Sequence, residues 1–228
     1  MKNTLKRVLS LVAVALVAFS CSSENGEEIG KYPVLAGTTW EYSKPICEID
    51  YPKDSIQIVM GMGTDEKISF TADQVMEMYN MFVGGLLESY IDYCQFIDDK
   101  RLTIGYEIDG ESDLFVIGYS QVDKYIQIDM AVVNPAMPKI SINYIIESVG
   151  SKKYMDVYFE KNYITLMAQQ MLPVFLPEMM GEIIPEYDQM PEMVQTMIVT
   201  SLTNQINTIL SETNSLKVGL QLKEIVIK

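Results

Sequence analysis

Between Cys94 and Phe159 hydrophobic residues recur at every second position, and no other feature of this sequence restricts the fold as strongly. Successive side chains of a β-strand point to opposite faces, so a period of two predicts strands with one apolar face. The pattern occupies the segments 101–110, 112–120, 124–132, 139–147 and 153–160, and the pair Asp109-Gly110 is typical of a hairpin turn. Short strands joined by tight turns favour an antiparallel barrel or sandwich.

Further strands are expected on both sides of this region. We predict a leading loop and first strand within 32–48, a second strand at 55–62, a short apolar piece at 67–70, and a final strand at 215–228. The final strand could pair with the first and close the sheet, which would remove its exposed edges. The predicted fold is therefore mainly β with helical insertions (α+β), built on an antiparallel barrel of about eight strands.

Two helical regions interrupt the strands, near 72–91 and 161–213. Thr71 and Gln74 fit a capping box at the start of the first region. In the second, hydrophobic residues recur mostly every four positions from Ile164 to Ile183. Because an ideal helix repeats every ~3.6 residues, one straight helix could not keep this stripe on one side. We expect a longer helix from about Pro191 to Glu212, preceded by two or three short helices with breaks at Pro173, Pro177 and Pro185.

The first residues are typical of an export signal. Basic residues precede an apolar run, Val8 to Phe19, that is shorter than the ~20 residues of a membrane-spanning helix. Cys21 directly follows Ser20, and this junction resembles a bacterial lipobox, in which the cysteine thiol receives a diacylglycerol. We expect a lipoprotein signal peptide at 1–20, a flexible acidic tether at 21–31 and one domain at 32–228, held at the outer membrane on its cell-surface or periplasmic face. An ordinary signal peptide cut nearby is the alternative.

The lack of histidine and the negative charge exclude several classes of function. Without histidine the sequence lacks the commonest general base and metal ligand, so we expect no enzyme, no metal site and no cofactor. A net charge of −14 makes nucleic acid a poor partner. Two carboxylate pairs, Asp98-Asp99 and Glu107-Asp109, are expected to be solvated charges, since alternation places Glu107 and Asp109 on the outer face.

Two cysteines remain if Cys21 carries the lipid. Compartments beyond the inner membrane are oxidising, so Cys47 and Cys94 could form a disulfide. Such a bridge would stabilise the fold by ~4 kcal/mol through its effect on the unfolded chain. Two buried free thiols are the alternative.

The segment "GTTWEY" resembles the lipocalin G-x-W signature, with one additional residue between the glycine and the tryptophan. Together with "EYSKPICE", the amphipathic helix that follows and the terminal "SLKVGLQLKE", it makes most of the chain after residue 31 similar to lipocalin-like lipoproteins of gut Bacteroidetes, a group without an assigned activity. The resemblance implies a barrel whose tryptophan plugs the closed end, covered by a basic side chain from the last strand. Trp40 would take the first role, and Lys217 or Lys223 the second.

An eight-stranded barrel can enclose one small ligand, and the inward-facing residues indicate its chemistry. Because these residues are apolar or amphipathic, the expected ligand is a small hydrophobic or amphipathic molecule. The alternative is that the same side chains simply fill the interior. The candidate ligand-facing residues are Tyr42, Ile104, Tyr106, Ile126, Ile128, Ile142 and Tyr144.

A second class of function is a surface interaction module that docks a partner protein or a glycan. It predicts a filled barrel and an exposed patch, whereas a carrier predicts a cavity lined by apolar strand residues. One candidate patch is the Met-rich stretch 171–193 of the helical insertion at 161–213, since methionine suits adaptable binding surfaces. The other is a sugar-stacking aromatic face formed by Trp40, Tyr42, Tyr106, Tyr119 and Tyr125.

Overall fold

The computed structural model describes residues 32–59, 67–85, 88, 91–108, 111–129, 140–184 and 186–226. Cys21, the predicted signal peptide and the acidic tether lie outside these residues. The chain divides into two compact units. The barrel unit takes residues up to Ile46, Tyr79–Phe159 and the chain from Val218, and the helical unit takes Cys47–Met78 and Glu160–Lys217. The predicted insertion at 161–213 is therefore only part of the helical unit.

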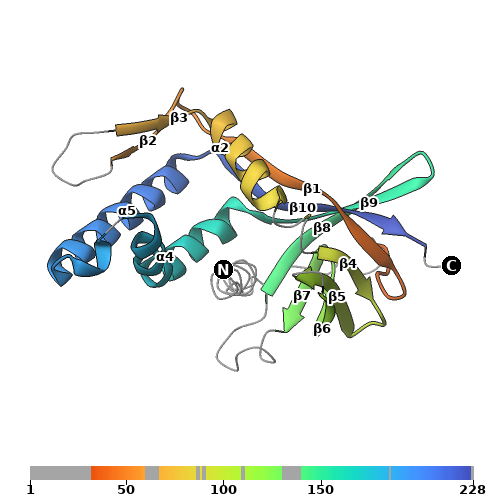
Figure 1. Cartoon of the computed structure of the whole chain (residues 1–228). Helices are drawn as coiled ribbons and strands as arrows, with labels where there is room; N and C mark the ends of the chain where they lie inside the picture. The colour runs from red at the N-terminus through yellow and green to blue at the C-terminus, as the bar shows by residue number, and fades with distance from the viewer. Residues whose placement is uncertain are drawn as a thin grey trace. The chain divides into compact units, whose positions relative to one another are not determined.

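Eight strands form a closed barrel (Figure 1). Each strand lies beside the next barrel strand along the chain, which is the arrangement of an antiparallel up-and-down barrel. The last strand lies beside the first and closes the sheet, so the predicted fold class and closure are confirmed. The barrel strands are β1 (Thr39–Asp50), β4 (Ile91–Phe96), β5 (Arg101–Ile108), β6 (Glu111–Val122), β7 (Tyr125–Asp129), β8 (Ile140–Val149), β9 (Lys152–Glu160) and β10 (Ser215–Ile225).

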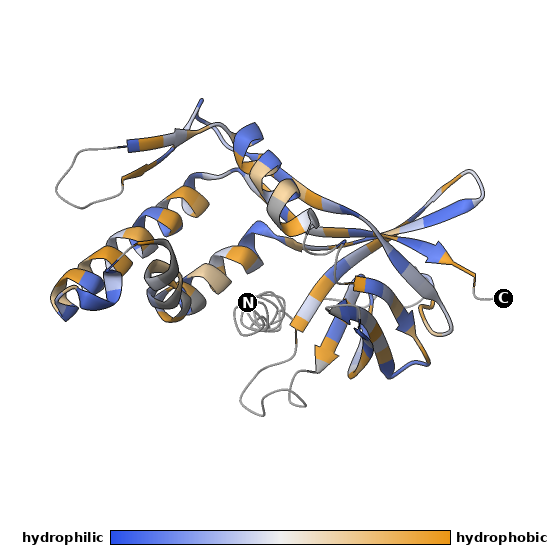
Figure 2. Cartoon of the chain, viewed as in Figure 1, coloured by the Kyte–Doolittle hydropathy of each residue, from blue (hydrophilic) through white to orange (hydrophobic). Residues whose placement is uncertain are grey.

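The alternating residues of the sequence lie on the two opposite faces of the barrel sheet. Hydrophobic and hydrophilic residues follow one another along its strands (Figure 2). In the hairpin β5–β6, Ile108 lies opposite Glu111. The predicted turn residues, Asp109-Gly110, lie outside the described residues, but this register is the one that a two-residue turn produces.

Two glycines allow neighbouring barrel segments to approach closely. A Cβ atom on Gly219 of β10 would lie 2.0 Å from the carbonyl oxygen of Val157 on β9. A Cβ atom on Gly105 of β5 would lie 2.3 Å from the ring of Tyr93 on β4. Both distances are far inside van der Waals contact, so no larger residue fits without moving its neighbour.

The helical unit combines a small hairpin with long helices. The hairpin pairs β2 (Ile56–Val59) with β3 (Lys67–Phe70), which form a separate sheet of two strands, so the predicted strand at 55–62 does not join the barrel. The remaining elements are most of α2 (Ala72–Tyr79), then α4 (Lys161–Ile183), the 3₁₀ turn η3 (Tyr187–Gln189) and α5 (Glu192–Glu212).

The first helical region, predicted near 72–91, starts as predicted and is helical at every residue from Ala72 to Gly85. The hydroxyl of Thr71 accepts from the N–H of Gln74 at 3.2 Å, and the side chain of Gln74 accepts from the N–H of Thr71 at 2.9 Å, which is a capping box. After α2 the chain continues as a π-helical segment, η1 (Asn80–Gly84), in the barrel unit. Gly85 and Glu88 are again α-helical, and β4 begins at Ile91, where the helical region was predicted to end.

The prediction that prolines divide the second helical region was wrong. α4 runs unbroken from Lys161 to Ile183 with Pro173 and Pro177 inside it, while Pro185 lies outside the described residues. A proline offers no N–H to the carbonyl four residues earlier, which here means the carbonyls of Gln169 and Pro173. Both residues are exposed, so water can bond these carbonyls instead.

Because α4 is continuous, the four-residue stripe of hydrophobic residues rotates around it. Each step of four residues turns ~40° past a full circle. Met167 is buried, whereas Met179, three steps later, is exposed. Leu176 and Met180 instead pack in a cluster with Tyr187 of η3 and Ile198 of α5. The predicted bounds of α5 are confirmed.

The two long helices form a hairpin, and hydrogen bonds join the start of α4 to the end of α5. The ammonium group of Lys161, at the start of α4, donates to the carbonyl of Ser211 at 3.2 Å and to the carbonyl of Thr213. These residues lie at the end of α5, so the chain leaves the hairpin close to where it entered. Among the described residues, none of the helices combines the length and hydropathy needed to cross a bilayer.

Candidate binding site in the barrel

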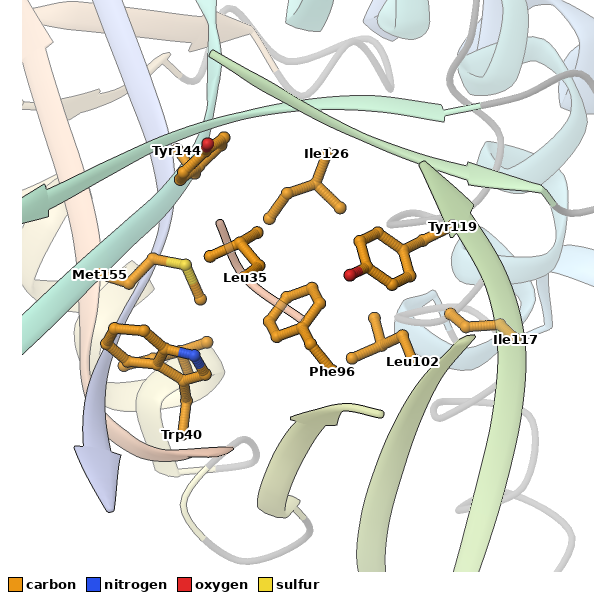
Figure 3. Close-up of a cluster of buried hydrophobic side chains, with 10 residues drawn as sticks. Leu35, Trp40, Phe96, Leu102, Ile117, Tyr119, Ile126, Tyr144 and Met155 are labelled. Atoms are coloured by element: carbon orange, nitrogen blue, oxygen red, sulfur yellow. The ribbon is translucent and has the colours of Figure 1, made fainter. Parts of the chain in front are cut away.

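One end of the barrel interior is closed by the segment that precedes β1. Leu35 in this segment is completely buried, and Figure 3 shows it between Trp40, Phe96 and Tyr144. Gln121 fixes the segment: its Oε1 accepts from the N–H of Leu35 at 3.2 Å, and its Nε2 donates to the carbonyl of Pro33 at 2.8 Å. This end is therefore packed and sealed by hydrogen bonds.

Trp40 lies in this packed end and is 1% exposed. Its Nε1 donates to the hydroxyl of Thr38 at 2.7 Å, and that hydroxyl donates to the carbonyl of Leu35 at 2.6 Å. The indole thus has its one polar group satisfied while its rings contribute to the core. This burial is what a barrel plug requires, and the role remains a prediction.

The lysines predicted to cover Trp40 have other partners. Lys223 pairs with Glu41 at 2.5 Å. Glu41 follows Trp40 directly, so the two side chains point to opposite faces of β1, and Lys223 lies on the outer face. Lys217 belongs to the helical unit, where it pairs with Glu48 at 3.5 Å. The assignment of Lys223 as the cover of Trp40 is therefore corrected.

Two buried tyrosines complete the closed end. The hydroxyl of Tyr119 donates to the carbonyl of Asp98 at 2.6 Å, and its ring meets that of Phe96 edge-on at 5.0 Å. Tyr144 accepts from the amide of Gln121 through its hydroxyl. Burial is the main reason that the pKa of each phenol rises to about 12, and nearby carboxylates contribute. Both tyrosines are therefore neutral hydrogen-bonding groups over the physiological pH range.

The opposite half of the interior is less completely filled. Leu102 and Ile117, which lie opposite each other on β5 and β6, are buried in the core, so the interior is on their side. Side chains two residues along a strand share a face, and so do directly opposed residues. The next pair, Ile104 and Phe115, therefore also faces inward. Phe115 is nevertheless 39% exposed, whereas Leu102 and Ile117 are 5% and 4% exposed.

The hydroxyl group of Tyr42, in the barrel unit, lacks a hydrogen-bond partner. It lies two residues beyond Trp40 on β1, and its buried hydroxyl makes no hydrogen bond to any described residue. A Cβ atom on Gly84 of η1 would lie 3.5 Å from this oxygen, so the hydroxyl faces that segment. Burial, followed by the charge of Glu88, raises the pKa of Tyr42. A neutral phenol here can donate one hydrogen bond to a ligand.

The other predicted ligand-facing residues divide between the two halves. Ile126 and Tyr144 are buried in the core of the closed end, which corrects their assignment and matches the filled-interior alternative there. Ile104 and Ile128 are partly buried against the same core, and Ile142 lies opposite Ile126. Tyr106 is partly buried and donates to Asp113 at 3.2 Å.

Sequence reasoning missed Leu35, Gln121 and Phe115. Leu35 and Gln121 belong to no pattern, because a loop residue and a single inward polar residue leave no periodic signal. Phe115 could have been found, since the turn predicted from the sequence at Asp109-Gly110 would pair it with Ile104, and the register has this pair.

The predicted disulfide is absent, because Cys47 and Cys94 are both free thiols. Cys94 on β4 lies opposite Trp40 on β1. From Trp40 to Ile46 the same strand advances ~20 Å at ~3.3 Å per residue, and Cys47 follows Ile46. A disulfide needs Cα atoms within ~7 Å of each other. Burial raises the pKa of Cys47 to about 11 and that of Cys94 to about 12, so both thiols stay protonated.

The predicted sugar-stacking face does not form. Trp40 and Tyr119 are buried in the barrel core and cannot present their rings to a glycan. Among the carboxylates, Asp98 accepts from the N–H groups of Lys100 and Arg101 and pairs with the Arg101 guanidinium, which holds the pKa of Asp98 below its usual value. It stabilises a turn. Glu107 is exposed, as predicted, and Asp109 lies outside the described residues.

The Met-rich stretch is split between core and surface. Met180 is buried, whereas Met179 is exposed, and Met193 at the end of the stretch is 75% exposed. Met197, one turn further along α5, is 65% exposed. Exposed apolar residues one turn apart form a small apolar surface on the first half of α5.

Within the described residues, no group of three or more histidine, cysteine, aspartate or glutamate side chains is arranged to hold a metal ion. No protein-family model matches the chain, and neither a curated protein nor a solved structure is significantly similar to it. The fold and the chemistry of its residues are therefore the basis for assigning a function.

Proposed function

We propose that the protein is a non-enzymatic, lipid-anchored outer-membrane protein that binds a small hydrophobic or amphipathic molecule in the less filled half of its barrel. The supporting observation is the contrast between two neighbouring pairs of inward residues: Leu102 and Ile117 are buried, whereas Phe115 beside Ile104 is 39% exposed. An inward-facing aromatic ring left in water is costly unless a ligand covers it.

The unpartnered hydroxyl of Tyr42 indicates that the ligand carries a hydrogen-bond acceptor. A buried donor without a partner costs about 1–3 kcal/mol, and an acceptor on the ligand would remove this cost. The proposed ligand is therefore mostly apolar, with a hydrogen-bond acceptor. The lipid on Cys21, the outer-membrane location and the likeness to lipocalin-like lipoproteins are parts of the same proposal and rest on the sequence.

Native mass spectrometry of the protein extracted from its own outer membrane tests the proposal. A reproducible extra mass that is lost on denaturation is the expected result, and it would supply the mass of the ligand. A bare polypeptide mass that gains nothing from a lipid extract would contradict it.

Phe115→Asp and Leu114→Asp are a matched pair for locating the ligand. The residues are adjacent and both exposed, but Leu114 lies opposite Gly105 on the outer face. Binding in the barrel predicts that Phe115→Asp loses the extra mass and Leu114→Asp keeps it. Equal loss in both variants would place the ligand elsewhere.

A second candidate function is docking of a partner protein through the helical insertion. The observation in its favour is the exposed apolar surface formed by Met193 and Met197 on α5. Cross-linking in intact cells tests it: a Met193→Glu/Met197→Glu double variant should lose a specific cross-linked partner, and unchanged cross-links would exclude this surface.

A further inference from the structure

A polar hollow of about 550 Å³ lies within the helical unit. One wall is the segment from Tyr51 to Gln57, which leads into β2, and the other is the last part of α5, from Asn204 to Glu212. Figure 1 shows these elements, coloured orange and blue. The volume is within the ~300–1,000 Å³ of small-molecule sites, but the lining is unusually polar for such a site.

The two walls are tied together on both sides of the hollow. On one side Gln205 of α5 accepts from the N–H of Val59 at 2.6 Å and donates to the carbonyl of Val59 at 3.0 Å. On the other, Glu212 accepts from the hydroxyl of Tyr51 at 2.8 Å and pairs with Lys53 at 2.7 Å. These bonds fix the distance between the walls, so the hollow is formed before any ligand arrives.

Between these two groups of bonds, several polar side chains of the lining are free to bind a ligand. Asp54, Ser55, Gln57 and Asn204 line the hollow, and their side chains make no hydrogen bond to any residue that the structure describes. Thr208 donates its hydroxyl hydrogen to the carbonyl of Asn204 at 2.8 Å and keeps its lone pairs. Both walls therefore offer donors and acceptors toward the same space.

The charges of the lining select against ionic ligands. Lys53 is already neutralised by Glu212, and the further carboxylate of Asp54 leaves the hollow with a negative balance. An anion would meet this negative balance without a free cation to hold it. Hydroxyl groups, in contrast, donate and accept at once and match a mixture of amides, hydroxyls and a carboxylate.

We propose that this hollow is a binding site for a neutral, hydroxyl-rich molecule of the size of a short oligosaccharide. The site is separate from the barrel and does not depend on the function proposed for it. Asn204 and Gln57, from opposite walls, bind the ligand through their amides, and Gln205 and Glu212 hold the walls in place.

Saturation-transfer difference NMR on the full chain in a zwitterionic detergent tests this site, with maltotriose and cellotriose as neutral ligands. Glucose 6-phosphate and putrescine are the anionic and cationic comparisons. At least one trisaccharide should show saturation transfer and bind, while the charged molecules should not. Asn204→Ala and Gln57→Ala should each weaken binding about three- to tenfold, as the loss of one neutral hydrogen bond does.

Thr200→Ala is the matched control, because Thr200 is exposed on the same helix and does not line the hollow. It should leave the affinity unchanged, and equal thermal midpoints of all variants show that the fold is intact. Absence of signal from both trisaccharides, binding of only the charged molecules, or affinities that Asn204→Ala and Gln57→Ala leave unchanged would overturn the proposal.

Discussion

Truncation of Trp40 to alanine should strongly destabilise the barrel unit. The side chain is 1% exposed, and an aromatic residue of this kind buries about 200 Å². At ~25 cal/mol per Å² the lost burial is worth about 5 kcal/mol, and aromatic core truncations cost ~3–5 kcal/mol by direct comparison. The lost hydrogen bond adds little, because the Thr38 hydroxyl still donates to the carbonyl of Leu35. The free energy of unfolding should therefore fall by about 3–5 kcal/mol.

Urea unfolding followed by far-UV circular dichroism measures this loss. Trp40 is the single tryptophan of the chain, so its fluorescence cannot report on the variant. Leu114→Ala is the control, since exposed substitutions usually change stability by less than ~0.5 kcal/mol. Trp40→Phe keeps part of the ring volume and should lose less than Trp40→Ala, which keeps the test informative if the alanine variant does not fold. A loss below ~1 kcal/mol in Trp40→Ala would refute the packing argument.

Three further predictions use other parts of the structure. Gly219→Ala should lower the thermal midpoint sharply, because its Cβ would lie 2.0 Å from a β9 carbonyl oxygen, whereas Gly85→Ala has open space around it and should change the midpoint little; equal effects would contradict the close approach. Ellman titration of the unfolded, unreduced protein should detect both Cys47 and Cys94, since both are free; no reactive thiol would mean that they are bridged. The folded-state pKa values of Tyr119 and Tyr144 lie above those of the unfolded chain, so the stability they provide is complete below pH ~10 and is lost as pH rises from ~10 toward ~12. Circular dichroism measures the thermal midpoint as a function of pH. A midpoint that stays constant between pH ~10 and ~12 would contradict this pH dependence.

The barrel could be predicted from the sequence because the pattern that indicates it is local and is repeated in each strand. Each strand between Cys94 and Phe159 shows its own alternation, and an antiparallel meander joins neighbours in sequence. The closing pair, β1 and β10, followed from the need to remove sheet edges. The capping box of α2 was equally local, since two side chains three residues apart determine it.

What could not be predicted depends on distant groups. Pro173 and Pro177 were expected to break α4, but their effect depends on whether water can reach two carbonyls, which only the fold decides. The pairing of Cys47 with Cys94 depended on strand register, and register placed Cys94 beside Trp40 instead. The walls of the polar hollow are joined by residues nearly 150 positions apart, such as Val59 and Gln205, and no sequence pattern connects them.

The tie between Lys161 and the end of α5 has a consequence for the order of folding. β9 ends at Glu160 and β10 begins at Ser215, so the final closure of the barrel must bring together strands separated by a long stretch of chain. Closing a flexible loop costs ~0.6 kcal/mol more for each doubling of its length. If α4 and α5 fold first, Lys161 already holds the two ends together, and the helical hairpin acts as a tight turn. Barrel closure would then be limited by helix pairing, which is local and fast, and not by a search of the whole chain.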